Sequence, residues 1–421
     1  MTEDEGLPFD PKMLDRMANV CIKFGLNLQR GQDLIITSTV ESLPLVRRIV
    51  EEAYRAGAGV VTTLLSDEEI SLAKYRYGNE ESFDRAPEWI FKGMAEAFGN
   101  NTARLAISAD NPMLLSEQDP EKVSRLGKAM SIASKPAMER ITNFETNWNI
   151  VSYPGSKWAK QVFPELSEEE AIRKLAEVIF SASRINGSDP ISDLRAHHEN
   201  LKKRQEWLNE YSFSSLHYTG PGTDLTIGLA DGHAWKGGAS MAKNGIICSP
   251  NIPTEEVFTT PHANRVDGFV KATKPLVHRG TIIEGIEVCF EKGKIVKASA
   301  SKGEEVFLQL LDTDNGSRRL GEVALVPHSS PISQSGVLFY NTLYDENAAC
   351  HIALGQCYSK CFIEDISSNP KAIENSGGNS SMIHVDWMIG SEELDIDGIT
   401  REGEIVPIFR KGEWVEDISI P

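Results

Sequence analysis

Residues 33–65 read DLIITSTVESLPLVRRIVEEAYRAGAGVVTTLL. The apolar run at 33–38 and the β-branched run at 60–65 each predict a strand, and residues 43–56 between them predict an amphipathic helix. Two parallel strands need a crossover connection, so this strand–helix–strand order predicts a parallel sheet in an α/β domain. The same alternation recurs at 103–109 and 149–154, which extends the predicted sheet.

Neither predicted turn carries a phosphate-binding pattern. A dinucleotide site needs Gly-x-Gly-x-x-Gly directly after a strand, where the missing side chains let the backbone approach pyrophosphate. Here Gly57-Ala58-Gly59 follows the helix instead, which is typical of a helix C-cap and turn. The α/β pattern therefore does not indicate a nucleotide-binding protein.

Composition sets the broad class. The 421 residues include 43 Lys and Arg against 61 Asp and Glu, a formal charge of −18, which disfavours nucleic-acid binding because that needs a basic face. The chain shows neither a secretory signal nor an apolar run long enough to cross a membrane. We expect a soluble, cytoplasmic protein without a membrane or nucleic-acid partner. Its six scattered cysteines are expected to be reduced thiols.

The pattern changes along the chain, and the length favours more than one domain. Residues 1–165 form the predicted N-terminal α/β domain, and the charged stretch 166–212 predicts a helical connector that begins at the N-cap Ser167. His197 and His198 fall in this stretch and are expected on a solvated helix face. Residues 213–421 alternate short β-patterned segments with Gly and Pro turns, predicting a C-terminal α/β domain with a mixed sheet.

The run Ser381–Gly390 is strand-like and apolar apart from two polar residues in its interior, His384 and Asp386. A spacing of two places both side chains on one face of a strand. Burying either residue alone is costly, so the two must hydrogen-bond to each other or bind a metal. The spacing leaves both interpretations open.

Three further residues are candidates for chemistry. His351 and Tyr358 fall in residues 344–362, which predict a long helix, and a spacing of seven places them on one helix face. Ordinary core packing is the alternative for both. Glu322 enters an apolar strand, where its carboxylate needs a cation, either an arginine at 318 or 319 or a metal.

Glu255 and Glu256 are adjacent acids between Pro253 and Pro261, in an otherwise uncharged stretch. In a two-metal hydrolase one carboxylate binds the ions while another takes the proton from the attacking water, and an adjacent pair suits that division. An exposed turn that happens to carry two acids is the alternative interpretation.

Together these segments resemble the aminopeptidase T, aminopeptidase S and aminopeptidase II family of two-metal metalloaminopeptidases. The resemblance extends over most of the chain. It is carried, in order, by Asn149–Pro154, Trp158–Pro164, Pro250–His262, Leu320–Glu322, Tyr340–His351, Tyr358 and Ile383–Asp386.

The resemblance implies a homodimeric exopeptidase that removes N-terminal residues from peptides with a free N-terminus. It implies metal ligands at Glu256, Glu322, His351, His384 and Asp386, with Glu322 taken as the bridging carboxylate, and an active-site tyrosine at Tyr358. By analogy with other two-metal aminopeptidases Glu255 is the general base, although Glu255 and Glu256 can exchange roles. Mixed imidazole and carboxylate ligands favour two Zn²⁺ ions, with Co²⁺, Mn²⁺ or Mg²⁺ as alternatives. Another two-metal amidase or deacylase, or a metal-stabilised scaffold without activity, remains the competing interpretation.

Overall fold

The computed structural model describes residues 6–278, 281–363, 366 and 369–415. It divides into two compact units. The first contains Met1–Arg195 with Ala239–Pro253, and the second contains Ala196–Gly238 with Thr254–Pro421. The division at 165/166 and 212/213 expected from the sequence stays a proposal. Within the described residues no helix is long and apolar enough to cross a membrane.

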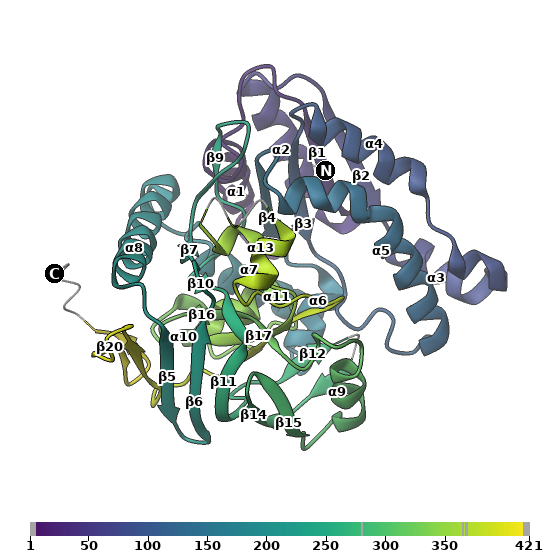
Figure 1. The fold of residues 1–421 in the computed structure, drawn as a ribbon. Coiled ribbons are helices and arrows are strands. Elements are labelled where there is room, and N and C mark those ends of the chain that lie inside the picture. Colours follow the sequence, from purple (N-terminus) through teal and green to yellow (C-terminus); the bar gives the residue numbers. More distant parts are fainter. Residues whose placement is uncertain (1–5, 279–280, 364–365, 367–368, 416–421) are drawn as a thin grey trace. The chain divides into compact units, whose positions relative to one another are not determined.

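The first unit contains a parallel four-stranded sheet of order β2-β1-β3-β4 (Figure 1). The strands are β1 (Leu34–Thr39), β2 (Val61–Ser66), β3 (Ala103–Ser108) and β4 (Trp148–Ser152), and α2 (Leu43–Arg55) crosses from β1 to β2. The predicted strand–helix–strand unit and its recurrences are therefore confirmed. Helices α4 (Glu88–Gly99) and α5 (Pro120–Thr142) pack on one sheet face, where Ile35 meets Phe98 and Ile141. The helices of the first half of the chain are α1 (Lys12–Val20), α3 (Glu68–Tyr77), α4 (Glu88–Gly99), α5 (Pro120–Thr142), α6 (Ser156–Val162), α7 (Glu168–Ala182) and α8 (Pro190–Tyr211).

The second unit is built on two larger antiparallel sheets. One has eight strands in the order β15-β14-β11-β6-β5-β19-β20-β21, and the other has five in the order β18-β17-β16-β10-β7. Figure 1 shows β5, β6, β11, β14 and β15 side by side. Every ladder between the described strands of this unit is antiparallel rather than mixed, while the α/β class is confirmed.

The strands of the eight-stranded sheet are β5 (Ser215–Gly220), β6 (Thr223–Leu229), β11 (Pro261–Lys271), β14 (Glu287–Glu291), β15 (Lys294–Ser299), β19 (Asp395–Ile399), β20 (Ile405–Arg410) and β21 (Glu413–Trp414). Those of the five-stranded sheet are β7 (Lys236–Gly237), β10 (Val257–Thr259), β16 (Leu320–Leu325), β17 (His351–Gly355) and β18 (His384–Met388). A short pair forms at β12 (Leu276–His278) with β13 (Thr281–Ile283), and another at β8 (Ser240–Met241) with β9 (Ile247–Cys248), which belongs to the first unit. The α-helices of this unit whose bounds the structure describes are α9 (Glu304–Leu311), α10 (Pro331–Gln334), α11 (Thr342–Asp345) and α13 (Pro370–Asn375).

The long helix predicted over residues 344–362 is wrong. Helix α11 ends at Asp345, a 3₁₀ turn η4 follows at Glu346–Ala348, and residues 351–355 form the buried strand β17. Every residue of β17 is buried, so both of its faces are covered, and a fully buried strand lacks the alternation that separates it from a helix. His351 and Tyr358 consequently share no helix face.

Candidate metal centre

One sheet gathers the predicted metal ligands. Glu322 lies on β16, His351 on β17, and His384 with Asp386 on β18, and these three strands are neighbours. Glu256 directly precedes β10, which pairs with β16 on the other side. The topology of the sheet thus brings together residues that are far apart in sequence, for example Glu256 and His384.

Strand register places the ligands on the same face. Glu322 pairs with Ala353, and Ala353 pairs with Asp386, so these three residues form one row across β16, β17 and β18. His384 pairs with Gly355 in the next row of that face. The small side chains on the central strand leave space between the polar groups. The opposite face carries Val323, Ile352, Leu354 and Trp387, which belong to the main hydrophobic core.

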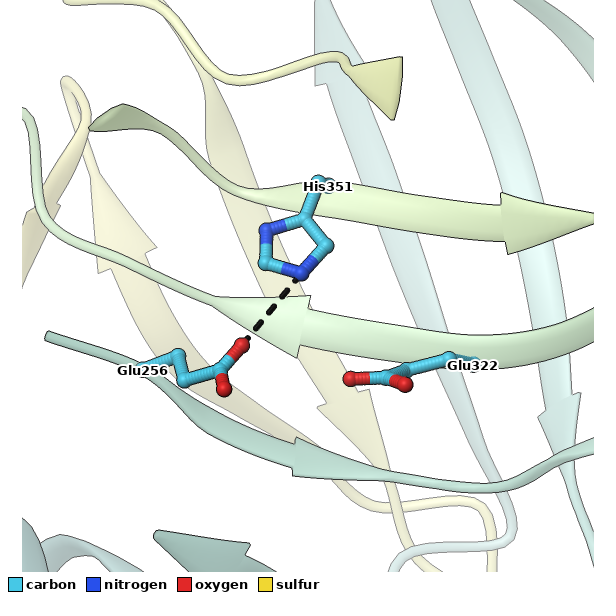
Figure 2. A group of neighbouring side chains, drawn as sticks. All are labelled: Glu256, Glu322 and His351. Atoms are coloured by element: carbon cyan, nitrogen blue, oxygen red, sulfur yellow. Dashed lines mark ion pairs between the residues drawn. The ribbon is translucent and has the colours of Figure 1, made fainter. Parts of the chain in front are cut away.

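The ligand atoms form two groups that share Glu322. Glu256, Glu322 and His351 form one group, and Glu322, His384 and Asp386 form the other, with the ligand atoms of each group within 4.8 Å of one another. Figure 2 shows the first group: the carboxylates of Glu256 and Glu322 point from opposite sides toward the space below the His351 ring. Nε2 of His351 lies 3.3 Å from Oε2 of Glu256. Glu322 is thus the one residue common to both groups, and its role as a bridging carboxylate stays a proposal.

Both imidazoles are held in the orientation that metal ligands adopt. Nδ1 of His351 lies 3.1 Å from the carbonyl oxygen of Ala349, and Nδ1 of His384 lies 2.7 Å from that of Gln356. A carbonyl only accepts hydrogen bonds, so each Nδ1 carries the proton and donates. Each Nε2 then faces carboxylates, at 3.3 Å from Glu322 and 3.4 Å from Asp386 in the case of His384. Nδ1–H bonded to a carbonyl is the usual support of a metal-binding histidine.

The electrostatics of the group favour a bound cation. Burial lowers the pKa of His351, but the hydrogen bond and charge of Glu256 outweigh it and raise that pKa to about 10. Burial raises the pKa of Glu322 despite the nearby His384. The buried Oε2 of Glu322 lies 3.3 Å from Nε2 of His384 but has no hydrogen-bond partner among the described residues. Convergent acceptors of this kind are stable only with added protons or a metal, and a divalent ion displaces those protons. The residues present therefore fit a divalent metal.

The arginine alternative for Glu322 is wrong. Arg318 pairs with Asp312 at 2.7 Å, and Arg319 donates to the carbonyl oxygen of Ala263 at 2.6 Å. The ion pair that Glu322 forms among the described residues is with His384, at 3.3 Å. The other interpretation of the 381–390 run was a simple pair between His384 and Asp386. This pair alone does not describe the site, because the carboxylate of Glu322 lies as close to the His384 imidazole as that of Asp386 does.

Tyr358 lies beside the ligands, at the start of a 3₁₀ turn rather than on a helix. Its ring centroid is 4.7 Å from that of His384 and 6.2 Å from that of Phe258. Desolvation and the carboxylates of Glu322 and Asp386 raise the pKa of Tyr358 well above its ordinary value. The phenol therefore stays protonated at neutral pH and can donate a hydrogen bond. Tyr358 is 37% exposed, so solvent or a substrate can reach it.

Glu255 is buried next to a different partner. Its Oε2 lies 3.6 Å from Nε2 of His197, and it belongs to neither ligand group among the described residues. His197 and His198 are not on a solvated face: His198 is 8% exposed, and the side chain of His197 is 14% exposed. The charged composition of α8 concealed this inward face, because a single histidine pair produces little apolar periodicity.

Glu346 is a further carboxylate influenced by the charges of the proposed ligands, and the sequence interpretation did not single it out. Burial raises its pKa well above the ordinary value, and the charges of Glu256 and Asp386 raise it further. Such mutual influence places Glu346 within the electrostatic field of the ligands. A run of three polar residues, Asp345 to Asn347, among apolar neighbours could have drawn attention to Glu346. The long helix predicted there did not indicate where its side chain points.

Comparison with known proteins gives independent evidence on the family of this chain. The family model described as thermophilic metalloprotease (M29) matches residues 10–414. Aminopeptidase T of Thermus thermophilus is 49% identical over 404 residues, covering 96% of this chain and 98% of that protein. Aminopeptidase AmpS of Bacillus subtilis is 42% identical over 401 residues, covering 95% and 98%. The solved structure of wild-type AmpT from Thermus thermophilus superposes with a TM-score of 0.92 at 48% identity, covering 96% of this chain and 99% of that one.

Proposed function

Because the chain belongs to the M29 family of thermophilic metalloproteases, it is a metalloaminopeptidase, and we propose that two divalent ions held around Glu322 serve its chemistry. The observation that carries this proposal is the shared position of Glu322 in both ligand groups. A carboxylate common to two groups of acceptors is the usual basis of a dinuclear site. The substrates are proposed to be peptides with a free N-terminus.

The proposed ligands are Glu256 and His351 for one ion, His384 and Asp386 for the other, and Glu322 for both. Five ligands for two ions leave coordination positions open, as a catalytic site requires. When bound, such ions supply Lewis acidity that lowers the pKa of an attacking water and polarises the scissile carbonyl. Ligand chemistry favours Zn²⁺, and Co²⁺, Mn²⁺ and Mg²⁺ remain alternatives.

The residues of the chain have three proposed tasks. The five proposed ligands hold the ions and leave coordination positions open for the free amino group of the substrate. Glu255 accepts the proton of the attacking water and later returns it to the leaving amine. Tyr358, which stays protonated, donates a hydrogen bond from its hydroxyl to the oxyanion that develops on the scissile carbonyl. Glu346 is the second candidate for proton acceptor, because it lies in the field of the ligands.

Two substrates and a chelator test this proposal. The purified chain loaded with Zn²⁺ or Co²⁺ is expected to hydrolyse a leucyl anilide at least about 10²-fold faster than the N-acetylated anilide, because the site recognises a free amine. Chelation is expected to abolish the reaction, and added Zn²⁺ or Co²⁺ to restore it. Metal analysis before chelation is expected to find two ions per chain.

Other results would change the assignment. Equal rates on the two anilides would indicate an amidase or deacylase that needs no free amine. A scaffold protein would show no metal-dependent hydrolysis at all, and Glu256→Ala or His384→Ala would then have no activity to remove. Less than about one ion per chain, without rescue by added metal, would contradict the metal centre itself.

Replacing the tyrosine gives a further prediction. Tyr358→Phe is expected to lower kcat by roughly 10²–10³-fold with little change in KM or metal content, because the lost donor acts on the developing oxyanion. Tyr77→Phe, at a tyrosine that is 85% exposed in the first unit, is the matched control. A kcat of Tyr358→Phe within about threefold of the wild type would remove the tyrosine from the mechanism.

We also propose that the chain acts as a homodimer in the cytoplasm. The family resemblance supports the dimer, and large apolar side chains of the first unit are exposed, among them Ile70 (74%) and Trp89 (76%). All six cysteines are free thiols, which fits a reducing compartment.

A further inference from the structure

We infer that His197 and Asn347 are positioning residues that hold one peptide group of the ligand segment, the one joining Thr254 to Glu255, and thereby aim Glu256 at the metal. The inference rests on the proposed function, since it concerns the same metal centre. Neither residue belongs to a ligand group, and neither role follows from the sequence, where His197 was expected to face solvent.

The carbonyl side of this peptide group is bonded to α8. Nε2 of His197 lies 2.7 Å from the carbonyl oxygen of Thr254. The carbonyl can only accept, so the imidazole carries its proton on Nε2 and donates it there. The same nitrogen lies 3.6 Å from Oε2 of Glu255, which adds electrostatic attraction. His197 therefore anchors both the backbone and the neighbouring acid.

The amide side of the same peptide group is bonded to η4. The backbone N–H of Glu255 donates to Oδ1 of Asn347 at 2.6 Å, and Asn347 is completely buried. Nδ2 of Asn347 donates in turn to the carbonyl oxygen of Leu343 at 2.9 Å. Because its oxygen accepts an N–H and its nitrogen meets a carbonyl, the side-chain amide has only one orientation that satisfies both bonds.

Two separate elements thus fix the plane of a single peptide. The C=O and N–H of a trans peptide point in opposite directions, so bonds at both ends prevent rotation about the chain axis. Glu256 is the next residue, and its carboxylate stands 3.3 Å from His351. Rotation of the preceding peptide would swing this carboxylate away from the ligand group. Supporting groups of this kind typically change metal affinity by 10–100-fold when removed.

Binding of Zn²⁺ alone, measured by competition with a chromophoric chelator, tests the inference. His197→Phe keeps the ring volume but loses the donor, and it is expected to weaken Zn²⁺ binding by about 10–100-fold. His197→Gln places an amide N–H near the position of Nε2 and is expected to restore binding to within about threefold of the wild type. Asn347→Ala is expected to weaken Zn²⁺ binding as much as His197→Phe does. In the double variant, His197→Phe with Asn347→Ala, the loss of binding free energy is expected to be smaller than the sum of the two single losses, because both residues hold one peptide group.

His217→Phe is the matched control, since His217 also pairs with an acid, Asp224 at 2.9 Å, on two strands outside the metal centre. It is expected to bind Zn²⁺ as the wild type does. The inference is overturned if His197→Phe binds as tightly as the wild type, or if His197→Gln is as weak as His197→Phe. The Zn²⁺ affinities of His197→Phe and His197→Gln test the inference even if Asn347→Ala does not fold. If the wild type binds no Zn²⁺, the proposed function fails instead, which is a distinguishable result.

Discussion

Glu322→Gln is expected to lower kcat/KM by more than about 10³-fold, because it removes the ligand common to both groups, whereas a supporting residue alone changes affinity by 10–100-fold. Glutamine keeps the size of the side chain but offers one neutral oxygen. Metal analysis is expected to show a loss of both ions. Glu256→Gln, at a ligand of one group only, is expected to lose a single ion. Loss of two ions from Glu322→Gln but of one ion from Glu256→Gln is the result expected if Glu322 binds both ions.

Two controls separate metal loss from misfolding. Glu287→Gln changes an acid on β14 that pairs with Lys271 at 2.7 Å, outside the centre, and is expected to keep full activity. Metal-free Glu322→Gln is expected to unfold at a temperature no lower than metal-free wild type, because burial raises the pKa of Glu322 and a neutral group there relieves an unfavourable charge. Retention of two ions by Glu322→Gln would show that the carboxylate is not shared.

Local patterns predicted the first unit well. The parallel sheet followed from residues 33–65, because its strands are short apolar runs separated by an amphipathic helix with a clear glycine stop. Strand β17 was not predictable from such a pattern, because a strand covered on both faces has no alternation. Its end depends on a tertiary contact: Gly355 has φ of +102°, and a Cβ there would overlap the carbonyl oxygen of Ile383.

The proposed ligands stood out in the sequence for a different reason. Acids and imidazoles in apolar segments are costly to bury, so Glu322, His384 and Asp386 were conspicuous without any knowledge of the fold. Their convergence depends on strand order, which the sequence pattern does not contain. Residues that act through hydrogen bonds to backbone, such as Asn347, leave no pattern because their partners are peptide groups. His197 was hidden for the same reason.

Glu255→Gln is expected to lower kcat by roughly 10²–10⁴-fold while both ions remain bound, because the proposed proton acceptor is lost but the ligands are not. The backbone N–H of residue 255 keeps its bond to Asn347 in this variant, so Glu256 stays in place. Glu346→Gln is expected to reduce kcat by less than about tenfold. Steady-state kinetics on the leucyl anilide, with metal content determined on the same samples, measure both effects.

The expectation that Glu255 acts rather than Glu346 follows from their surroundings. Burial and neighbouring carboxylates raise the pKa of Glu346 well above its ordinary value, so without bound cations it is a protonated acid and a poor acceptor. Glu255 instead faces the imidazole of His197, a donor. If Glu346→Gln shows the large loss and Glu255→Gln does not, bound cations must ionise Glu346, and the acceptor role passes to it. Loss of metal from Glu255→Gln would instead make Glu255 a ligand, the exchange of roles that adjacent acids permit.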